Sequence, residues 1–120
     1  MAELDGLRVL VVEDELMVAI MVEEVLRNAG CVVIGPIPRV AKAAEVAREA
    51  AIDVALLDVN VAGERVYAVA DALIARDLPF IFMTGYGRGE LPAQYVGRPA
   101  IAKPFKIDRL LSLLIAAVSA

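Results

Sequence analysis

Residues Arg8-Val9-Leu10-Val11-Val12 form a short, mostly apolar run that ends directly in the acidic pair Glu13-Asp14. The run is rich in β-branched residues, lacks a polar alternation and is too short for a helix, so it predicts a strand buried on both faces. A segment with helical spacing follows from Leu16 to Asn28, and Gly30 supplies a typical helix stop. The opening of the chain therefore predicts a strand-helix unit with carboxylates at the carboxyl end of the strand.

The same alternation of short apolar runs and helical segments continues to the end of the chain. Further strands are predicted at 31–34, closed by Gly35-Pro36, and at 54–57, 79–83 and 99–102. Helices are predicted from apolar residues at helical spacing, namely Val40, Ala43, Ala44, Ala47 and Ala51, then Val66, Ala70, Leu73 and Ile74, and finally Leu110, Leu111, Leu114, Ile115 and Val118 after Ile107. Four glycines and a proline between residues 85 and 97 predict that the fourth helix is short, frayed or mobile.

Five strands that alternate with helices predict an α/β fold with a doubly wound, parallel five-stranded sheet, a (βα)5 arrangement. Parallel neighbours need right-handed helical crossovers, which cover both faces of the sheet. The length of 120 residues and the 60% of hydrophobic residues suit one domain over residues 1–120 with a single buried core. Sheets of this kind bind ligands at the carboxyl ends of their strands, so the residues there are the candidates for function.

Composition excludes several classes of function. The net charge of -4 gives no basic surface for a nucleic acid, and no apolar stretch is long enough to span a bilayer. The chain has no histidine, which removes histidine triads, most zinc sites and a histidine phosphotransfer role. Its one cysteine, Cys31, lies in an apolar run and cannot form an internal disulfide. We therefore expect a cytoplasmic protein that binds neither nucleic acid nor membrane.

Polar side chains gather at the predicted carboxyl ends of the strands: Glu13 and Asp14, Asp58, Thr84 and Lys103. Each has an ordinary explanation as a helix cap, a turn residue or a solvated cation, but their joint position at one edge favours a site. Two carboxylates 4 Å apart repel by about 4 kcal/mol at an effective dielectric of 20, so a cation is expected among them. Oxygen ligands without histidine or cysteine favour Mg²⁺, and a carboxylate beside it can attack a phosphoryl group.

Four motifs together resemble those of response-regulator receiver domains. They are Val11-Val12-Glu13-Asp14-Glu15, Leu56-Leu57-Asp58-Val59-Asn60, Phe82-Met83-Thr84-Gly85 and Lys103-Pro104-Phe105. The resemblance covers essentially the whole chain and implies a flavodoxin-like fold with strand order 2-1-3-4-5. It also implies a stand-alone response regulator of a bacterial two-component phosphorelay, which takes a phosphoryl group from a sensor histidine kinase. Such a domain catalyses only its own phosphorylation and dephosphorylation, and it signals through contacts with a downstream protein.

The resemblance also implies a role for each matching residue. Asp58 is the expected phosphoacceptor, Thr84 the switch hydroxyl and Lys103 the lysine that pairs with the phosphoryl group. Mg²⁺ would be bound by Asp14, by Asp58 and by the carbonyl of Asn60, with Glu13 acting through water. The Lys103-Pro104 peptide bond is cis in this family as a rule, so a cis bond is expected here.

The sequence departs from the family pattern at positions that concern switching. Ala100 stands where most receivers have Tyr or Phe, so the usual aromatic switch is missing. Ala62 replaces a common proline and is followed by Gly63, which predicts a looser turn. The run from Phe82 to Tyr86 resembles a receiver subclass with a Phe-x-Thr-Gly-Tyr motif, which is paired with kinases of the HWE or a related type. Tyr86 is the expected replacement for the missing switch ring, through ordering of its loop.

Three other interpretations stay open at this stage. A phosphatase similar to the haloacid dehalogenases would need an acid two residues after its nucleophile, where this chain has Asn60. A degenerate receiver would act as a scaffold independent of phosphorylation, although the acidic, Thr and Lys positions are intact. On the closing helix, Leu113 with Ala116 and Ala117 widens the apolar face, which suggests either a partner surface, such as a homodimer, or deep packing.

Overall fold

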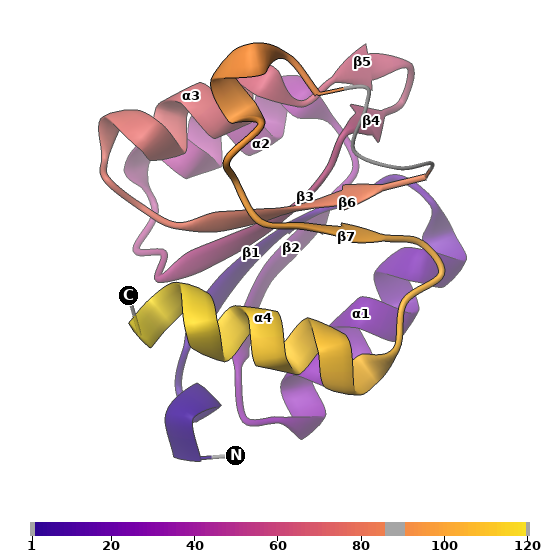
Figure 1. Ribbon diagram of the computed structural model, residues 1–120, viewed down its shortest axis with the longest axis vertical. Coiled ribbons are helices and arrows are strands. Elements are labelled where there is room, and N and C mark those ends of the chain that lie inside the picture. Colours follow the sequence, from indigo (N-terminus) through magenta and orange to yellow (C-terminus); the bar gives the residue numbers. More distant parts are fainter. Residues whose placement is uncertain (1, 86–90, 120) are drawn as a thin grey trace.

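The computed structural model describes residues 2–85 and 91–119, and its centre is a five-stranded parallel sheet in the order β2-β1-β3-β6-β7 (Figure 1). The strands are β1 (Arg8–Val12), β2 (Val32–Ile37), β3 (Val54–Asp58), β6 (Phe80–Thr84) and β7 (Ala100–Ala102). Because β4 and β5 form a separate small sheet, β6 and β7 are the fourth and fifth strands of the main one. The order therefore corresponds to the predicted 2-1-3-4-5.

Helices cover both faces of this sheet, as predicted for parallel strands. Figure 1 shows α1 (Leu16–Asn28) and α4 (Ile107–Ser119) on one face, and α2 (Val40–Glu49) and α3 (Tyr67–Ala75) on the other. Side chains of β1 alternate between two buried clusters, with Val9 and Val11 packed toward α1 and α4. Leu10 and Val12 pack toward α2 and α3. The short apolar strands are thus buried on both sides, which is why they read as nearly continuous hydrophobic runs.

Two predicted boundaries are wrong by more than one residue. Strand β2 does not stop at Gly35-Pro36 but runs on to Ile37, with a register shift against β1 between Leu10 and Val12. Gly35 has a positive φ of 106°, and a Cβ there would lie 2.7 Å from the Val11 carbonyl oxygen, so glycine lets the strand pass the irregularity. Ala51 is exposed and lies beyond α2, which ends at Glu49.

The turn after β3 is a small hairpin, and not the looser turn that the sequence predicted. Strands β4 (Asn60–Val61) and β5 (Glu64–Arg65) pair antiparallel around Ala62 and Gly63. Both turn residues have positive φ, 51° and 82°, as a tight two-residue hairpin of the primed type requires. The Ala62 N–H donates to Asp14 Oδ2 at 2.9 Å, so a contact from a distant part of the chain holds the turn.

The fourth crossover agrees with the prediction of a short helix. In the part of the chain that the structure describes, it contains the 3₁₀ helix η2 (Ala93–Tyr95) where the (βα)5 pattern would place an α-helix. Another 3₁₀ helix, η1 (Ala2–Leu4), precedes β1. No helix among the described residues is both long and apolar enough to cross a membrane.

Candidate functional site

Side chains from the carboxyl ends of four strands meet at one edge of the sheet. Glu13 and Asp14 follow β1, Asp58 ends β3, Thr84 ends β6 and Lys103 follows β7. A cavity of about 700 Å³ opens there, lined by Asp14, Glu15, Val18, Met21, Asp58, Asn60, Gly63, Gly85, Lys103, Pro104 and Phe105. The structure thus brings together the polar residues that the sequence placed at this edge, because parallel strands end on the same side.

Lys103 is the centre of the charge arrangement. Its Nζ donates to Glu13 Oε1 at 2.8 Å and to Asp58 Oδ2 at 3.1 Å, and it lies 4.0 Å from Glu15 Oε1. The Lys103 backbone N–H donates to the Thr84 carbonyl at 2.8 Å, which ties the ends of β6 and β7 together. The Lys103–Pro104 peptide bond is cis, as the family resemblance implied.

Glu13 is buried, and protein donors contact both oxygens of its carboxylate. Oε1 accepts from Lys103, and Oε2 accepts from the Glu15 backbone N–H at 3.0 Å. A buried carboxylate is costly unless it is paired and hydrogen-bonded, and this one is both. Each oxygen still has a further lone pair, so a contact through water remains open to Glu13.

Asp58 is the carboxylate whose protonation the site changes most. It is only 7% exposed. Burial and the neighbouring Glu13 carboxylate together raise the pKa of Asp58 to about 7, although Lys103 opposes the rise. Burial lowers the pKa of Lys103, but the contacts with Glu13 and Asp58 outweigh it, so the pKa of this lysine is raised. The lysine therefore stays charged, while Asp58 changes its protonation near neutral pH when no cation is bound.

Asp14 and Asn60 complete an oxygen-rich corner beside Asp58. Carboxylate oxygens of Glu13, Asp14 and Asp58 lie within 4.8 Å of one another. Asp14 is exposed, and its Oδ2 is the atom that accepts from Ala62. The Asn60 N–H lies 3.4 Å from Asp58 Oδ1.

The backbone carbonyl of Asn60 points away from its own hairpin. The Val66 N–H donates to the Val59 carbonyl, so Val59 and Val66 are a hydrogen-bonded pair. Bonded and unbonded pairs alternate in an antiparallel ladder, which leaves the pair Asn60 and Arg65 without ladder bonds. The Asn60 carbonyl therefore faces away from β5 and is free of the ladder, as a metal ligand must be.

The residues predicted for switching lie in different surroundings. Thr84 is 5% exposed, and its hydroxyl makes no hydrogen bond to another of the described residues. Ala100 is buried and pairs with Phe82 across β6 and β7. Tyr86 lies outside the described residues, so its expected role stays a prediction.

The sequence reasoning missed two residues that the structure brings to attention. Glu15 lines the cavity and approaches Lys103, and the only signal for it was its place as the third acid in Glu13-Asp14-Glu15. Tyr95 is 1% exposed and packs against β6. It gave no signal, because a single aromatic in a glycine-rich stretch shows no periodicity.

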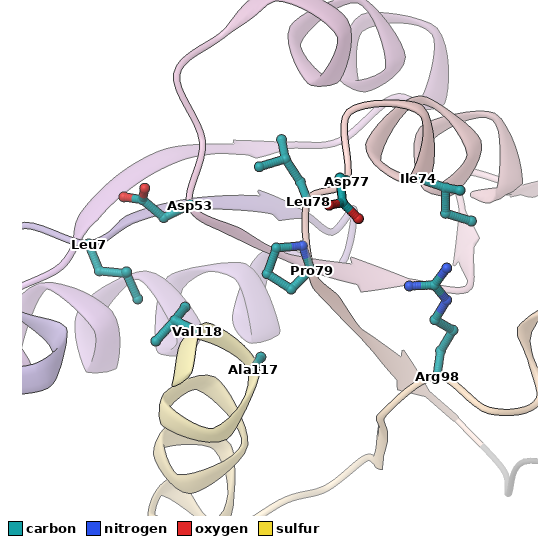
Figure 2. A pocket seen from close by; sticks show the side chains of 9 residues that line it. All are labelled: Leu7, Asp53, Ile74, Asp77, Leu78, Pro79, Arg98, Ala117 and Val118. Carbon is teal, nitrogen blue, oxygen red and sulfur yellow. The ribbon is translucent and has the colours of Figure 1, made fainter. Parts of the chain in front are cut away.

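A second cavity, of about 630 Å³, lies at the opposite, amino ends of the strands (Figure 2). It also contains a carboxylate, Asp53, which precedes β3. Asp53 accepts three hydrogen bonds from Arg8: from the backbone N–H at 2.8 Å, from Nε at 3.1 Å and from Nη2 at 3.0 Å. These bonds hold the pKa of Asp53 below its usual value.

Comparisons with known proteins agree with this geometry. Residues 9–115 match the model of the response regulator receiver domain. A solution structure of SdrG from Sphingomonas melonis Fr1 is 37% identical over 96% of this chain and 98% of that chain, with a TM-score of 0.83. The BeF3-activated conformation of SdrG from Pseudomonas melonis Fr1 is 36% identical over 92% and 95%, with a TM-score of 0.76.

A further structure shows the fold alone. The receiver domain of sensor histidine kinase PA1611 from Pseudomonas aeruginosa PAO1, with a magnesium ion in its active-site cleft, is 24% identical over 96% of this chain and 99% of that chain. Its TM-score is 0.85. No curated protein matches this chain.

Proposed function

Because this chain belongs to the response regulator receiver domain family, we propose that it is a single-domain response regulator of a bacterial two-component phosphorelay. In this proposal Asp58 accepts one phosphoryl group from a sensor histidine kinase in a Mg²⁺-dependent reaction. Members of this family are signalling domains, and the proposed chemistry is limited to phosphorylation and dephosphorylation of the domain itself. The observation that carries the proposal is the buried Asp58 carboxylate, 3.1 Å from Lys103 Nζ at the cavity.

The proposed transfer uses one carboxylate oxygen of Asp58 as the nucleophile. An oxygen–phosphorus bond forms as the nitrogen–phosphorus bond of the phosphohistidine breaks, and the leaving imidazole nitrogen keeps the electron pair. Lys103 offsets the negative charge that arrives with the phosphoryl group, since its Nζ already touches Asp58. The Thr84 hydroxyl is proposed to donate to a phosphoryl oxygen, because it ends the neighbouring strand without a partner of its own among the described residues.

The oxygen donors at the site fit a hard divalent cation. Asp14 has a second carboxylate oxygen that is not bonded to Ala62, and Asp58 has Oδ1, which Lys103 does not contact. The backbone carbonyl of Asn60 is not used in the pairing of β4 with β5. We propose these three as Mg²⁺ ligands, with Glu13 contributing through water. When bound, the cation would neutralise the carboxylates and the phosphoryl oxygens. Asp58, whose pKa is raised in its absence, would then be held as the carboxylate that the transfer requires.

The helix beside the cavity offers a surface on which a phosphodonor protein could lie. Four large apolar side chains of α1 are exposed: Leu16, Met17, Ile20 and Met21. Met21 also lines the cavity, so this apolar surface is continuous with the proposed site. A sensor kinase of the HWE type is the proposed donor, and an unidentified downstream protein is the proposed receiver of the signal. Both would act in the cytoplasm.

A homodimer through α4 remains a separate proposal. Leu113 and Ala117 are half-buried, and Ala116 is exposed on that helix. Leu113 and Ala117 pack partly against the core, which leaves less apolar surface for a second copy than the sequence suggested.

Intact-mass measurement after incubation with acetyl phosphate and Mg²⁺ tests the main proposal. We expect the mass of one phosphoryl group to be gained by the wild type and by Asp77→Asn, an exposed carboxylate at the other end of the sheet. Asp58→Asn should gain nothing, and excess EDTA should suppress the gain in the wild type. A gain that persists in Asp58→Asn would refute the assignment, and no gain in any protein would favour a phosphorylation-independent scaffold.

A further inference from the structure

Tyr95 forms a buried contact that lies outside the cavity and joins three elements. Its ring stacks on Tyr67 of α3, with centroids 4.9 Å apart and planes at 23°. It also meets the Phe82 ring of β6 edge-on, at 5.6 Å and 73°. Its hydroxyl donates to Asp71 Oδ1 on α3 at 2.5 Å. We call Tyr95, Asp71 and Tyr67 the tyrosine latch.

The latch ring lies on the part of the sheet where strand β7 contributes only a methyl group. Ala100 is the register partner of Phe82, and both are buried in the same cluster as Tyr95. An aromatic side chain on β7 at this position would compete with Tyr95 for the space beside Phe82. The ring that packs here therefore comes from η2, and not from the strand.

One hydrogen bond, to Asp71, holds the hydroxyl end of the Tyr95 ring. A tyrosine hydroxyl that leaves water needs a partner, and Asp71 provides it from the exposed side of α3. Burial and this bond both raise the pKa of Tyr95. The backbone bonds within residues 91–98, such as Tyr95 N–H to the Pro92 carbonyl and Arg98 N–H to the Tyr95 carbonyl, are local. Tyr95 thus attaches the segment to α3 through both its ring and its hydroxyl.

The latch is adjacent to the strand that ends in the proposed site. Phe82 and Thr84 are two residues apart on β6, so their side chains lie on the same face. Thr84 is also bonded to Lys103 through its carbonyl. A displacement of the end of β6 toward a phosphoryl group on Asp58 would therefore change the packing of Phe82 against Tyr95.

We propose that the tyrosine latch holds residues 91–98 on α3 while Asp58 is unmodified, and that it opens when Asp58 is phosphorylated. This inference rests on the proposed function, and it describes a conformational change that phosphorylation of Asp58 would cause. If a closed latch opposes the phosphorylated state, then weakening the latch must favour that state by the same factor.

Titration with beryllofluoride and Mg²⁺, a phosphoryl mimic, measures this coupling. Loss of one hydrogen bond should make Tyr95→Phe bind the mimic about three to ten times more tightly than the wild type. Asp71→Ala should behave in the same way, and the double variant should add little, because both changes remove the same bond. Tyr67→Phe is the matched control: it keeps the stacked ring and removes a hydroxyl outside the Asp71 bond, so its affinity should stay within about twofold of wild type.

Amide hydrogen exchange across 91–98 gives the second readout. The mimic should increase exchange in the wild type, and Tyr95→Phe should show increased exchange before the mimic is added. Equal or weaker mimic binding by Tyr95→Phe and Asp71→Ala, or wild-type exchange that the mimic leaves unchanged, would overturn the latch. A wild type that does not bind the mimic, or Asp58→Asn that binds it equally well, would instead mark the failure of the proposed function.

Discussion

The two ends of the sheet each hold a carboxylate beside a cation, but they differ in burial and in the number of competing charges. At the amino ends, Asp53 is partly exposed and accepts three hydrogen bonds from Arg8, which forms no other ion pair among the described residues. At the carboxyl ends, Asp58 is buried and shares Lys103 with Glu13. The pKa of Asp53 is accordingly lowered, whereas the pKa of Asp58 is raised to about 7.

This difference separates a carboxylate whose charge is compensated by its partner from one whose charge is not. A carboxylate whose negative charge is already compensated by protein donors is not stabilised further by a metal ion or by accepting a phosphoryl group. A buried carboxylate that must share its cation is incompletely compensated, and another cation at the site would relieve it. Cavity size does not distinguish the two ends, since both cavities measure between about 600 and 700 Å³.

Metal affinity should show the largest contrast between the two ends. We expect Asp14→Asn to weaken Mg²⁺ binding by about a hundredfold, because Asp14 is itself a proposed ligand. Mutation of a residue that only hydrogen-bonds to a ligand already lowers metal affinity by about 10- to 100-fold. The amide oxygen can still accept from Ala62, so the hairpin should persist. Asp53→Asn, the matched change at the amino ends, should leave the affinity unchanged. Calorimetric titration of both variants measures this, and a loss of affinity in Asp53→Asn as well would remove the contrast.

The pH dependence of stability should have opposite signs at the two ends. The folded pKa of Asp58 lies above its unfolded value of about 3.9, so the metal-free native state binds the extra proton and loses stability as pH rises from about 4 to 7. Above pH 7, metal-free Asp58→Asn should therefore be more stable than wild type, on the order of 1–3 kcal/mol.

Chemical denaturation in EDTA at a series of pH values checks this sign. The difference between wild type and Asp58→Asn should shrink toward pH 4 and should also shrink when Mg²⁺ is added at pH 8. Asp53, whose folded pKa is lowered, contributes stability that is present above its unfolded pKa and is lost as pH falls through the folded value. A difference that does not vary with pH would mean that Asp58 is not buried against Glu13 as described.

The smallest effect is expected from breaking the amino-end pair itself. The Arg8 and Asp53 side chains are 46% and 33% exposed, and ion pairs of that exposure contribute little to stability. Asp53→Asn should therefore lower the midpoint of thermal unfolding only slightly, and the shift should diminish at high salt because exposed charges are screened. A large shift that salt does not change would show that Asp53 has a structural role beyond this pair.

The strands and most helices could be predicted because their signals are local. The boundaries of β1, α1 and the start of α4 agree with the sequence reading, since hydrophobic spacing reflects which face of each element is buried. The Ala62-Gly63 turn could not be predicted, because Ala disfavours positive φ and the Asp14 carboxylate that holds the turn is far away in the sequence. The end of β2 was missed for a similar reason, as its backbone depends on contact with Val11.

The sequence by itself determined which residues meet at the candidate site. Parallel strands bring all their carboxyl ends to one edge, so the order of apolar runs was enough to place Asp58, Thr84 and Lys103 together. Only the tertiary structure decided how they share charge: that Lys103 divides its contacts between Glu13 and Asp58, and that Tyr95 fills the space beside Ala100. Such choices depend on burial and on distances between residues far apart in the chain, which no local pattern of residues encodes.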